Sequence, residues 1–233
     1  MAKRIIQQAR GKGSSTYRVR SQSFKYRLTY PPRLTGEGTV LKLFNSAAHS
    51  CPLAKIKYSE GFFYMPAFKG MIEGQKIEFG GKEIKPGNIL NLKNIPLKTS
   101  IYNIEVRPND GGKFVKTAGS SAIVSKIIGN KLFVLMPSKK EIELNENCRA
   151  VIGVCAGHGR LEKPFLKAGK KHHLVKSQGG RIWPRTSAIK VNAIDHPFGS
   201  GRGKNPKSKI AKRNAPPGAR VGLIRPRRTG KKK

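Results

Sequence analysis

Acidic residues are almost absent from both ends of this chain, and this limits which parts of it can fold alone. Residues 1–36 contain nine Lys and Arg and no acid, and residues 163–233 contain 21 Lys and Arg and one acid, Asp195. Residues 37–162 hold the other 11 acids, with 18 Lys and Arg. Because like charges repel in a compact state, we expect a folded core in 37–162 and basic extensions on both sides of it.

The total charge indicates a polyanionic partner. The 233 residues carry 48 Lys and Arg against 12 Asp and Glu, a formal net charge of +36. Nucleic acid is the most direct source of negative charge at that density. A membrane is not an expected partner, because no stretch reaches the ~18–20 apolar residues of a spanning helix and the basic runs lack an amphipathic period.

Two further features of the sequence concern the cellular compartment of the protein. Residues 1–10 lack the apolar core of a signal peptide, so we do not expect export. The three cysteines are odd in number and lack the spacing of a disulfide framework, which is typical of a reducing compartment. These features predict a cytoplasmic protein, with Cys148 and Cys155 as small core residues.

The central region has the pattern of an all-β protein. β-branched and aromatic residues gather in short runs that Gly, Pro or Asn separate. Short strands at this spacing predict closed or nearly closed barrels rather than one open sheet. The runs are residues 39–44, 53–58, 62–65, 75–79, 88–92, 101–106, 122–128, 131–136, 140–144 and 149–154.

Turn signals divide this region. Gly129-Asn130 tolerates the positive φ of a two-residue hairpin loop, so the strands on either side should pair directly. Residues 108–112 (PNDGG) interrupt the strand pattern and mark a boundary between two barrels. Residues 161–167 are helix-like, but Pro164 restricts them and Gly169 should end them, so we expect no long helix.

The Asp195-His196 pair resembles an acid–base dyad, but its context does not support catalysis. Neighbouring side chains of an extended chain point apart, and Pro197 favours an extended His196. The alternating glycines of 199–203 instead either let the backbone approach phosphates or form a flexible turn.

Nucleotide-hydrolase and zinc patterns are absent from the sequence. A phosphate-binding loop needs a glycine five positions before its Gly-Lys pair and Ser or Thr after it, whereas Gly203-Lys204 has Phe198 and Asn205 there. The cysteines and histidines form no Cys-x2-Cys pair with a matching second half. We therefore expect neither a metal nor a cofactor.

Aromatic residues among basic ones favour irregular RNA over duplex DNA. Trp183 has Arg181 and Arg185 two positions away on either side, so its ring either stacks on an unpaired base or anchors the tail to a domain. Four aromatic residues between positions 17 and 30 alternate with basic ones in the same way. No recognition-helix or zinc-finger signature is present to read DNA.

Seven motifs occur in order along almost the whole chain. They are residues 52–55 (PLAK), 111–119 (GGKFVKTAG), 147–154 (NCRAVIGV), 166–171 (LKAGKK), 183–185 (WPR), 192–199 (NAIDHPFG) and 214–224 (NAPPGARVGLI). Together they resemble the universal L-two family of large-subunit ribosomal proteins. The His-Pro-Phe-Gly form and the Arg-Arg-Thr-Gly of 227–230 are similar to its archaeal and eukaryotic branch. Ser200 stands where that family usually has the middle of three glycines.

The resemblance implies an oligonucleotide-binding (OB-fold) barrel at 37–108, an SH3-like barrel at 109–165, and irregular extensions at 1–36 and 166–233 that thread into large-subunit rRNA. It implies a non-enzymatic constituent of the large subunit that supports assembly and the peptidyl-transferase region. Other ribosomal proteins and the small subunit, at an intersubunit bridge, are the implied protein partners, with no small-molecule substrate. His196 matches the histidine that the family links to peptidyl transfer, where it would organise RNA.

The residues expected to contact RNA are basic side chains of the extensions and of the second barrel, together with residues of the quoted motifs. They are Arg4, Arg10, Lys12, Arg18, Arg20, Lys25, Arg27, Lys113, Lys116, Lys167, Lys170, Lys171, Arg181, Trp183, Arg185, Asp195, His196, Gly199, Gly201, Arg202, Lys204, Arg213, Arg220, Arg225, Arg227 and Arg228.

Two other functions stay open on the residues alone. One is a metal-dependent enzyme acting on RNA, which only the Asp195-His196 pair and the scattered cysteines and histidines favour. The other is an RNA chaperone outside the ribosome, which the basic extensions would equally suit.

Overall fold

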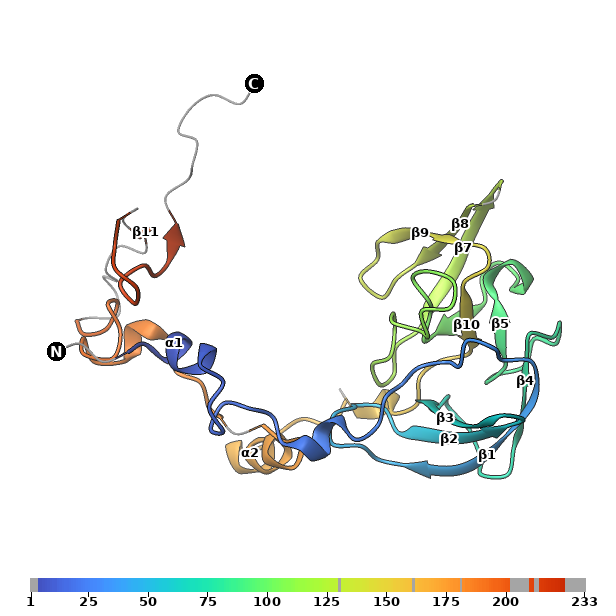
Figure 1. Cartoon of the computed structure of the whole chain (residues 1–233), viewed down its shortest axis with the longest axis horizontal. Helices are drawn as coiled ribbons and strands as arrows, with labels where there is room; N and C mark the ends of the chain where they lie inside the picture. The colour runs from blue at the N-terminus through green and yellow to red at the C-terminus, as the bar shows by residue number, and fades with distance from the viewer. Residues whose placement is uncertain are drawn as a thin grey trace, which may run out of the picture. The chain divides into compact units, whose positions relative to one another are not determined.

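The chain divides into two compact units, whose elements are drawn in Figure 1. A computed structural model describes residues 4–129, 131–160, 162–180, 182–201, 210–211 and 214–224. The larger unit spans Arg20–Gly179, and the smaller unit combines the described residues before Arg20 with those after Gly179.

One mixed ten-stranded sheet forms the larger unit, so the chain is mostly β as expected, and each of the ten predicted strands is present. The strand order is β3-β2-β1-β4-β5-β10-β6-β7-β8-β9, and the one parallel neighbour pair is β4 with β5. The strands are β1 (Gly36–Phe44), β2 (Leu53–Tyr58), β3 (Gly61–Pro66), β4 (Lys76–Phe79), β5 (Ile89–Asn91), β6 (Ser100–Tyr102), β7 (Ala122–Ile128), β8 (Lys131–Leu135), β9 (Glu141–Asn145) and β10 (Arg149–Ile152).

Local sequence explains these strands. In β8, Leu132 and Val134 are buried while the residues between and beside them are not, which is the period of two that a half-buried strand requires. The predicted hairpin between β7 and β8 is confirmed: Ile128 pairs with Lys131, and Gly129 has a φ of +57°. At other strand ends, the predicted and observed bounds differ by one to four residues, because where a strand ends depends on its pairing partner.

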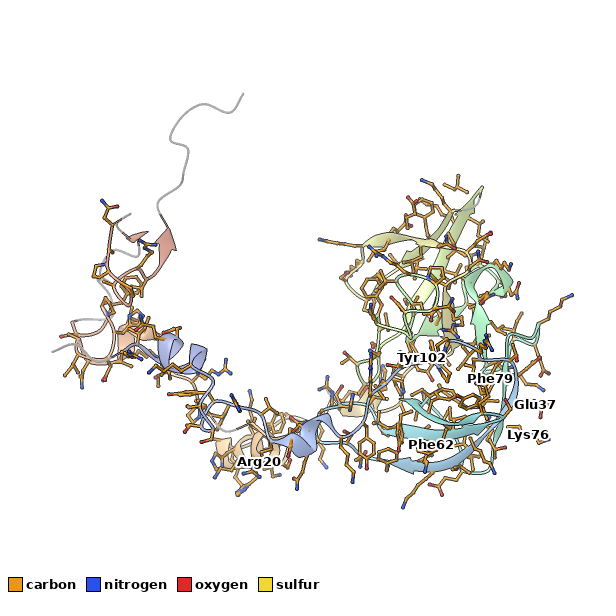
Figure 2. All side chains as sticks on the ribbon, viewed as in Figure 1. Arg20, Glu37, Phe62, Lys76, Phe79 and Tyr102 are labelled. Atoms are coloured by element: carbon orange, nitrogen blue, oxygen red, sulfur yellow. The ribbon has the colours of Figure 1, made fainter. Side chains whose placement is uncertain are left out.

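Two hydrophobic cores lie in the larger unit, and three central strands contribute to both. On β5, Ile89 belongs to the first core and Leu90 to the second. On β10, Val151 belongs to the first core, and its neighbours Ala150 and Ile152 belong to the second. Tyr102 of β6 joins Phe79 in the first core (Figure 2). Because successive side chains of a strand point to opposite faces, these strands separate the two cores.

The helices differ from the sequence expectation. The prediction that Gly169 ends a helix-like segment is wrong: residues 162–167 are not helical, and helix α2 spans Ala168–Ser177 with Gly169 in its first turn. Pro164 limits helix formation before this point, while lysines and a leucine favour it afterwards. Helix α1 covers Ile6–Gly11 in the smaller unit, and the 3-10 turns are η1 (Ser21–Phe24), η2 (Leu92–Asn94), η3 (His158–Arg160) and η4 (Ala188–Lys190).

The extensions thus carry short regular elements where irregular chain was expected. In the smaller unit, β11 (Ile210–Ala211) and β12 (Leu223–Ile224) also pair in parallel. The three cysteines are free thiols and fully buried in the larger unit, which confirms the prediction that Cys148 and Cys155 are core residues.

Candidate nucleic-acid interface

Most of the predicted basic residues present their side chains to solvent. Arg10 and Lys116 are half-buried, as is Trp183. The exposed ones are Arg4, Lys12, Arg18, Arg20, Lys25, Arg27, Lys113, Lys167, Lys170, Lys171, Arg185 and Arg220. The predicted contacts Arg181, Arg202, Lys204, Arg213, Arg225, Arg227 and Arg228 lie outside the described residues.

Three of the exposed predicted contacts lie in or directly before helix α2, which has no buried side chain. Lys167 precedes its first turn, and Lys170 and Lys171 lie within it. A helix with no buried side chain gains little from packing on its own protein, so its stability depends on other contacts. The last turn has one such contact, because the buried Ser23 hydroxyl donates a hydrogen bond to the Gln178 carbonyl at 3.3 Å.

An aromatic face lies on the outside of the sheet, and sequence reasoning found only one of its members. Its residues are Tyr26, Phe44 of β1, and Phe62 and Tyr64 of β3. The Tyr26 ring centroid lies 4.6 Å from that of Phe44 and 5.1 Å from that of Tyr64, and Phe62 lies 5.8 Å from Tyr64. The alternation in β3, where Phe63 and Met65 are buried, is the signal that could have identified Phe62 and Tyr64.

Lysines accompany the aromatic face. The Lys55 ammonium lies 4.1 Å from the Phe62 ring centroid, and the Lys25 ammonium lies 5.6 Å from that of Tyr26. The Phe62 side chain (Figure 2) is 56% exposed, so its ring is available to another molecule. Aromatic rings beside cations are the combination on which unpaired bases stack while their phosphates are neutralised.

The loop at the start of the predicted second barrel holds Lys113 and Lys116, two predicted RNA contacts, in different ways. Asp110 accepts hydrogen bonds from the backbone N–H groups of Val106, Arg107 and Gly112. Partial burial opposes ionisation, but these bonds and the ammonium of Lys113 outweigh it and lower the pKa of Asp110. Lys113, 3.5 Å from Asp110, keeps a 62% exposed side chain.

Lys116 is held by its own loop instead. Its ammonium donates a 3.0 Å hydrogen bond to the Gly112 carbonyl, and burial together with the charge of Lys113 lowers its pKa. A half-buried ammonium that already has a protein acceptor is less available to phosphate than an exposed one. The geometry therefore favours Lys113 over Lys116 as a contact.

In the smaller unit, the 191–201 loop folds back on its own backbone. The N–H groups of Asp195 and His196 both bond to the Asn192 carbonyl, at 3.0 and 3.3 Å, and Ser200 N–H bonds to the Val191 carbonyl at 2.9 Å. A Cβ at Gly199 would lie 2.4 Å from the Asn192 carbonyl oxygen, so only glycine fits there. The loop is thus a defined turn, and Gly199 allows its two ends to approach each other closely.

The residues after Gly199 take the left-handed backbone conformation. Ser200, in place of the family's usual glycine, has a φ of +67°, and Gly201 has a φ of +97°. A side chain is strained at such a φ, so the tight turn is kept here despite Ser200.

His196 is 6% exposed, and its hydrogen bond defines its proton position. The Phe198 N–H donates to His196 Nδ1 at 3.1 Å. Because Nδ1 accepts this bond, the ring nitrogen left to act as a donor is Nε2. Nδ1 is therefore occupied by the loop backbone, which leaves Nε2–H as the group that can meet a ligand.

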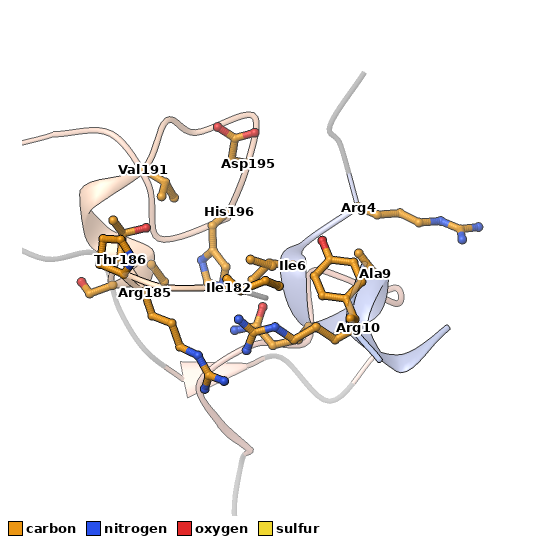
Figure 3. A pocket seen from close by; sticks show the side chains of 15 residues that line it. Arg4, Ile6, Ala9, Arg10, Ile182, Arg185, Thr186, Val191, Asp195 and His196 are labelled. Atoms are coloured by element: carbon orange, nitrogen blue, oxygen red, sulfur yellow. The ribbon is translucent and has the colours of Figure 1, made fainter. Parts of the chain in front are cut away.

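A cavity of about 600 Å³ lies beside His196 (Figure 3). Its wall combines residues of the N-terminal segment, including Ile6 and Arg10, with Ile182 and Arg185 from the C-terminal extension. The sequence predicted several of these residues as RNA contacts but could not predict that two segments so far apart would enclose a common space.

The described part of the chain contains neither a metal-binding cluster nor a membrane-spanning helix. Across the described residues, Cys, His, Asp and Glu form no group of three that could hold a metal ion. Within the described helices, none has the length and apolar character required to traverse a bilayer.

Comparisons with known proteins agree with the motifs. Residues 85–218 match the family described as Ribosomal Proteins L2, C-terminal domain. The chain is 44% identical to the large ribosomal subunit protein uL2 of Methanococcoides burtonii, over all of both chains. It is also 44% identical to the uL2 proteins of Archaeoglobus fulgidus, over 99% of both chains, and of Hyperthermus butylicus, over all of both. Because this similarity extends from end to end, the chain belongs to the uL2 family.

Proposed function

We propose that this chain, a structural constituent of the large ribosomal subunit and not an enzyme, binds large-subunit rRNA mainly through its two basic extensions. One observation carries the proposal: among the described Lys and Arg of residues 1–36 and 166–224, all are exposed except Arg10, which is half-buried. Those segments hold one acid, Asp195, so they can offer little charge compensation of their own. An rRNA surface supplies it.

The energy of this binding comes from counterion release. Each Lys or Arg that neutralises a phosphate frees a condensed cation, and the affinity then falls as salt rises. The aromatic face, in which Phe62 is exposed, adds stacking of unpaired bases, and stacking depends less on salt than phosphate contacts do. Within the smaller unit, His196 would organise RNA while the RNA performs any chemistry.

The parts of the chain would divide this work. We assign residues 37–108 to an OB-fold barrel, 109–165 to an SH3-like barrel, and 1–36 and 166–233 to extensions that thread into rRNA. The two hydrophobic cores support two β modules. Contacts with other ribosomal proteins and with the small subunit at an intersubunit bridge belong to the same proposal and rest on the family resemblance.

The salt dependence of binding tests the proposal. With the full chain and large-subunit rRNA, ten phosphate contacts give a slope of log affinity against log salt of roughly −7 to −9. Replacing Lys170 and Lys171 by Gln should make that slope shallower by about 0.7–0.9 for each residue. A slope near −2 for the unmodified chain, which corresponds to about two phosphate contacts, would contradict the proposal.

Two sheet lysines provide the matched control. Lys126 lies 2.9 Å from Glu141 and Lys131 lies 3.0 Å from Glu143. Because these ammonium groups already have carboxylate partners, replacing both by Gln should leave the slope unchanged. Sedimentation separates the ribosomal role from an RNA chaperone, since a subunit constituent stays with large subunits through moderate salt.

A further inference from the structure

We propose that the cavity beside His196 receives a single unpaired base of RNA, whose phosphates lie on the arginines at its edge. The inference rests on the proposed rRNA binding and identifies one ligand subsite within it. The cavity measures about 600 Å³ and lies entirely within the smaller unit, between residues 4–17 and 182–196 (Figure 3). This volume is within the range of sites that enclose small molecules, roughly 300–1,000 Å³.

The walls suit a flat apolar body. Ile6 and Ala9 of helix α1 contribute apolar lining from the N-terminal segment, and Ile182, Pro184 and Val191 contribute it from the C-terminal extension. The faces of a nucleobase are apolar and planar, and enclosing them removes them from water. A sugar or an inorganic ion would leave these walls without an apolar partner.

The charges at the cavity suit an anion attached to that body. Arg4, Arg10 and Arg185 line it against one carboxylate, that of Asp195. Guanidinium groups bind phosphate oxygens bidentately and also stack on bases. A base within the apolar walls with its phosphates among the arginines would use both kinds of surface.

His196 supplies the polar group that orients the base. Its ring lines the cavity and is 6% exposed, and Nδ1 is occupied by the Phe198 N–H. Nε2–H has no acceptor among the described residues. A ring nitrogen or carbonyl oxygen on a base edge is a suitable acceptor for this donor.

RNA is favoured over a neighbouring protein as the source of this ligand. An aromatic or acidic side chain from another protein would match the walls or the arginines, but a nucleotide carries both groups together. The two segments that build the cavity also belong to the most basic parts of the chain. The cavity therefore opens in a unit whose charge attracts polyanions.

Chemical probing of large subunits reconstituted with the full chain tests the inference. Dimethyl sulfate, kethoxal and carbodiimide together report unpaired bases of all four kinds. Ala9→Trp fills the cavity without changing charge, and His196→Ala removes the donor. We expect one unpaired rRNA base, protected by the unmodified chain, to become about tenfold more reactive in both variants. Ala193→Trp, at an exposed position of the same loop outside the cavity, is the matched control and should leave that base protected.

The outcomes separate this inference from the proposed function. Equal base reactivity in unmodified and cavity-filled subunits would overturn the subsite, while rRNA binding by the extensions would stand. If the variants do not enter subunits, ultraviolet crosslinking of unmodified subunits decides: a nucleotide adduct on Tyr17, which lines the cavity, supports the inference. A crosslink to a protein, or no nucleotide adduct, overturns it. A chain that binds no rRNA at all contradicts the broader proposal.

Discussion

Glu105 Oε1 lies 2.7 Å from Arg149 Nη2, and the two side chains are 0% and 10% exposed. The carboxylate also accepts hydrogen bonds from the backbone N–H groups of Asn109, Gly111 and Arg149. The guanidinium in turn donates to the Pro31 carbonyl at 2.8 Å. This buried ion pair therefore joins the N-terminal segment of the larger unit, the loop that carries Lys113, and strand β10.

Removing one partner of this pair should strongly destabilise the larger unit. Glu105→Ala leaves the Arg149 guanidinium buried without its carboxylate, a loss of about 3–5 kcal/mol in the free energy of unfolding. Urea unfolding of the full chain measures it. Glu143→Ala is the control, because its pair with Lys131 is largely exposed and contributes less than about 1 kcal/mol. Equal losses in the two variants would show that the buried pair has no special role.

The shared strands predict that the first β module does not fold alone. A fragment of residues 37–108 lacks Val151 and Cys155, which complete the first core, and loses β10, the strand that pairs with β5. We expect such a fragment to show no cooperative unfolding by circular dichroism, whereas residues 20–179 should unfold cooperatively. A folded 37–108 fragment would mean that β10 and the shared residues are dispensable.

Phe62 should contribute to RNA affinity through stacking. Its ring is exposed at the edge of the aromatic face, so Phe62→Ala is expected to weaken rRNA binding by about 1–3 kcal/mol without changing the salt slope. Filter binding at several salt concentrations separates the two effects. Leu97→Ala removes another half-exposed apolar side chain, outside the aromatic face, and should have no effect on affinity. Unchanged affinity in Phe62→Ala would remove the aromatic face from the interface.

Asp110 should make the stability of its loop depend on acid pH. Its pKa lies below the ordinary value of 3.8, so the ionised carboxylate stabilises the folded state above that value. This contribution is lost as the pH falls from about 4 through the lower folded-state pKa. The difference in unfolding free energy between the unmodified chain and Asp110→Asn should therefore shrink below pH 4. Urea unfolding at pH 3 and pH 6 measures it, and a constant difference would argue against this contribution.

Sequence by itself determined the local features of this protein. The alternation of Leu132 and Val134, the Gly129 turn and the small apolar cysteines each depend on neighbouring residues, so strands, hairpin and buried thiols could be predicted. The ordered motifs likewise identified the family. Charge segregation indicated a polyanionic partner because net charge requires no knowledge of the fold.

Only the tertiary structure decided which distant residues meet. A period of two shows that a strand has a buried face but not which strand lies beside it, so the position of β10 between β5 and β6, and with it the two shared cores, could not be predicted. The sequence likewise could not predict the pairing of Glu105 with Arg149 or the cavity beside His196. These contacts depend on chain closure over long separations, which local propensity and spacing do not encode.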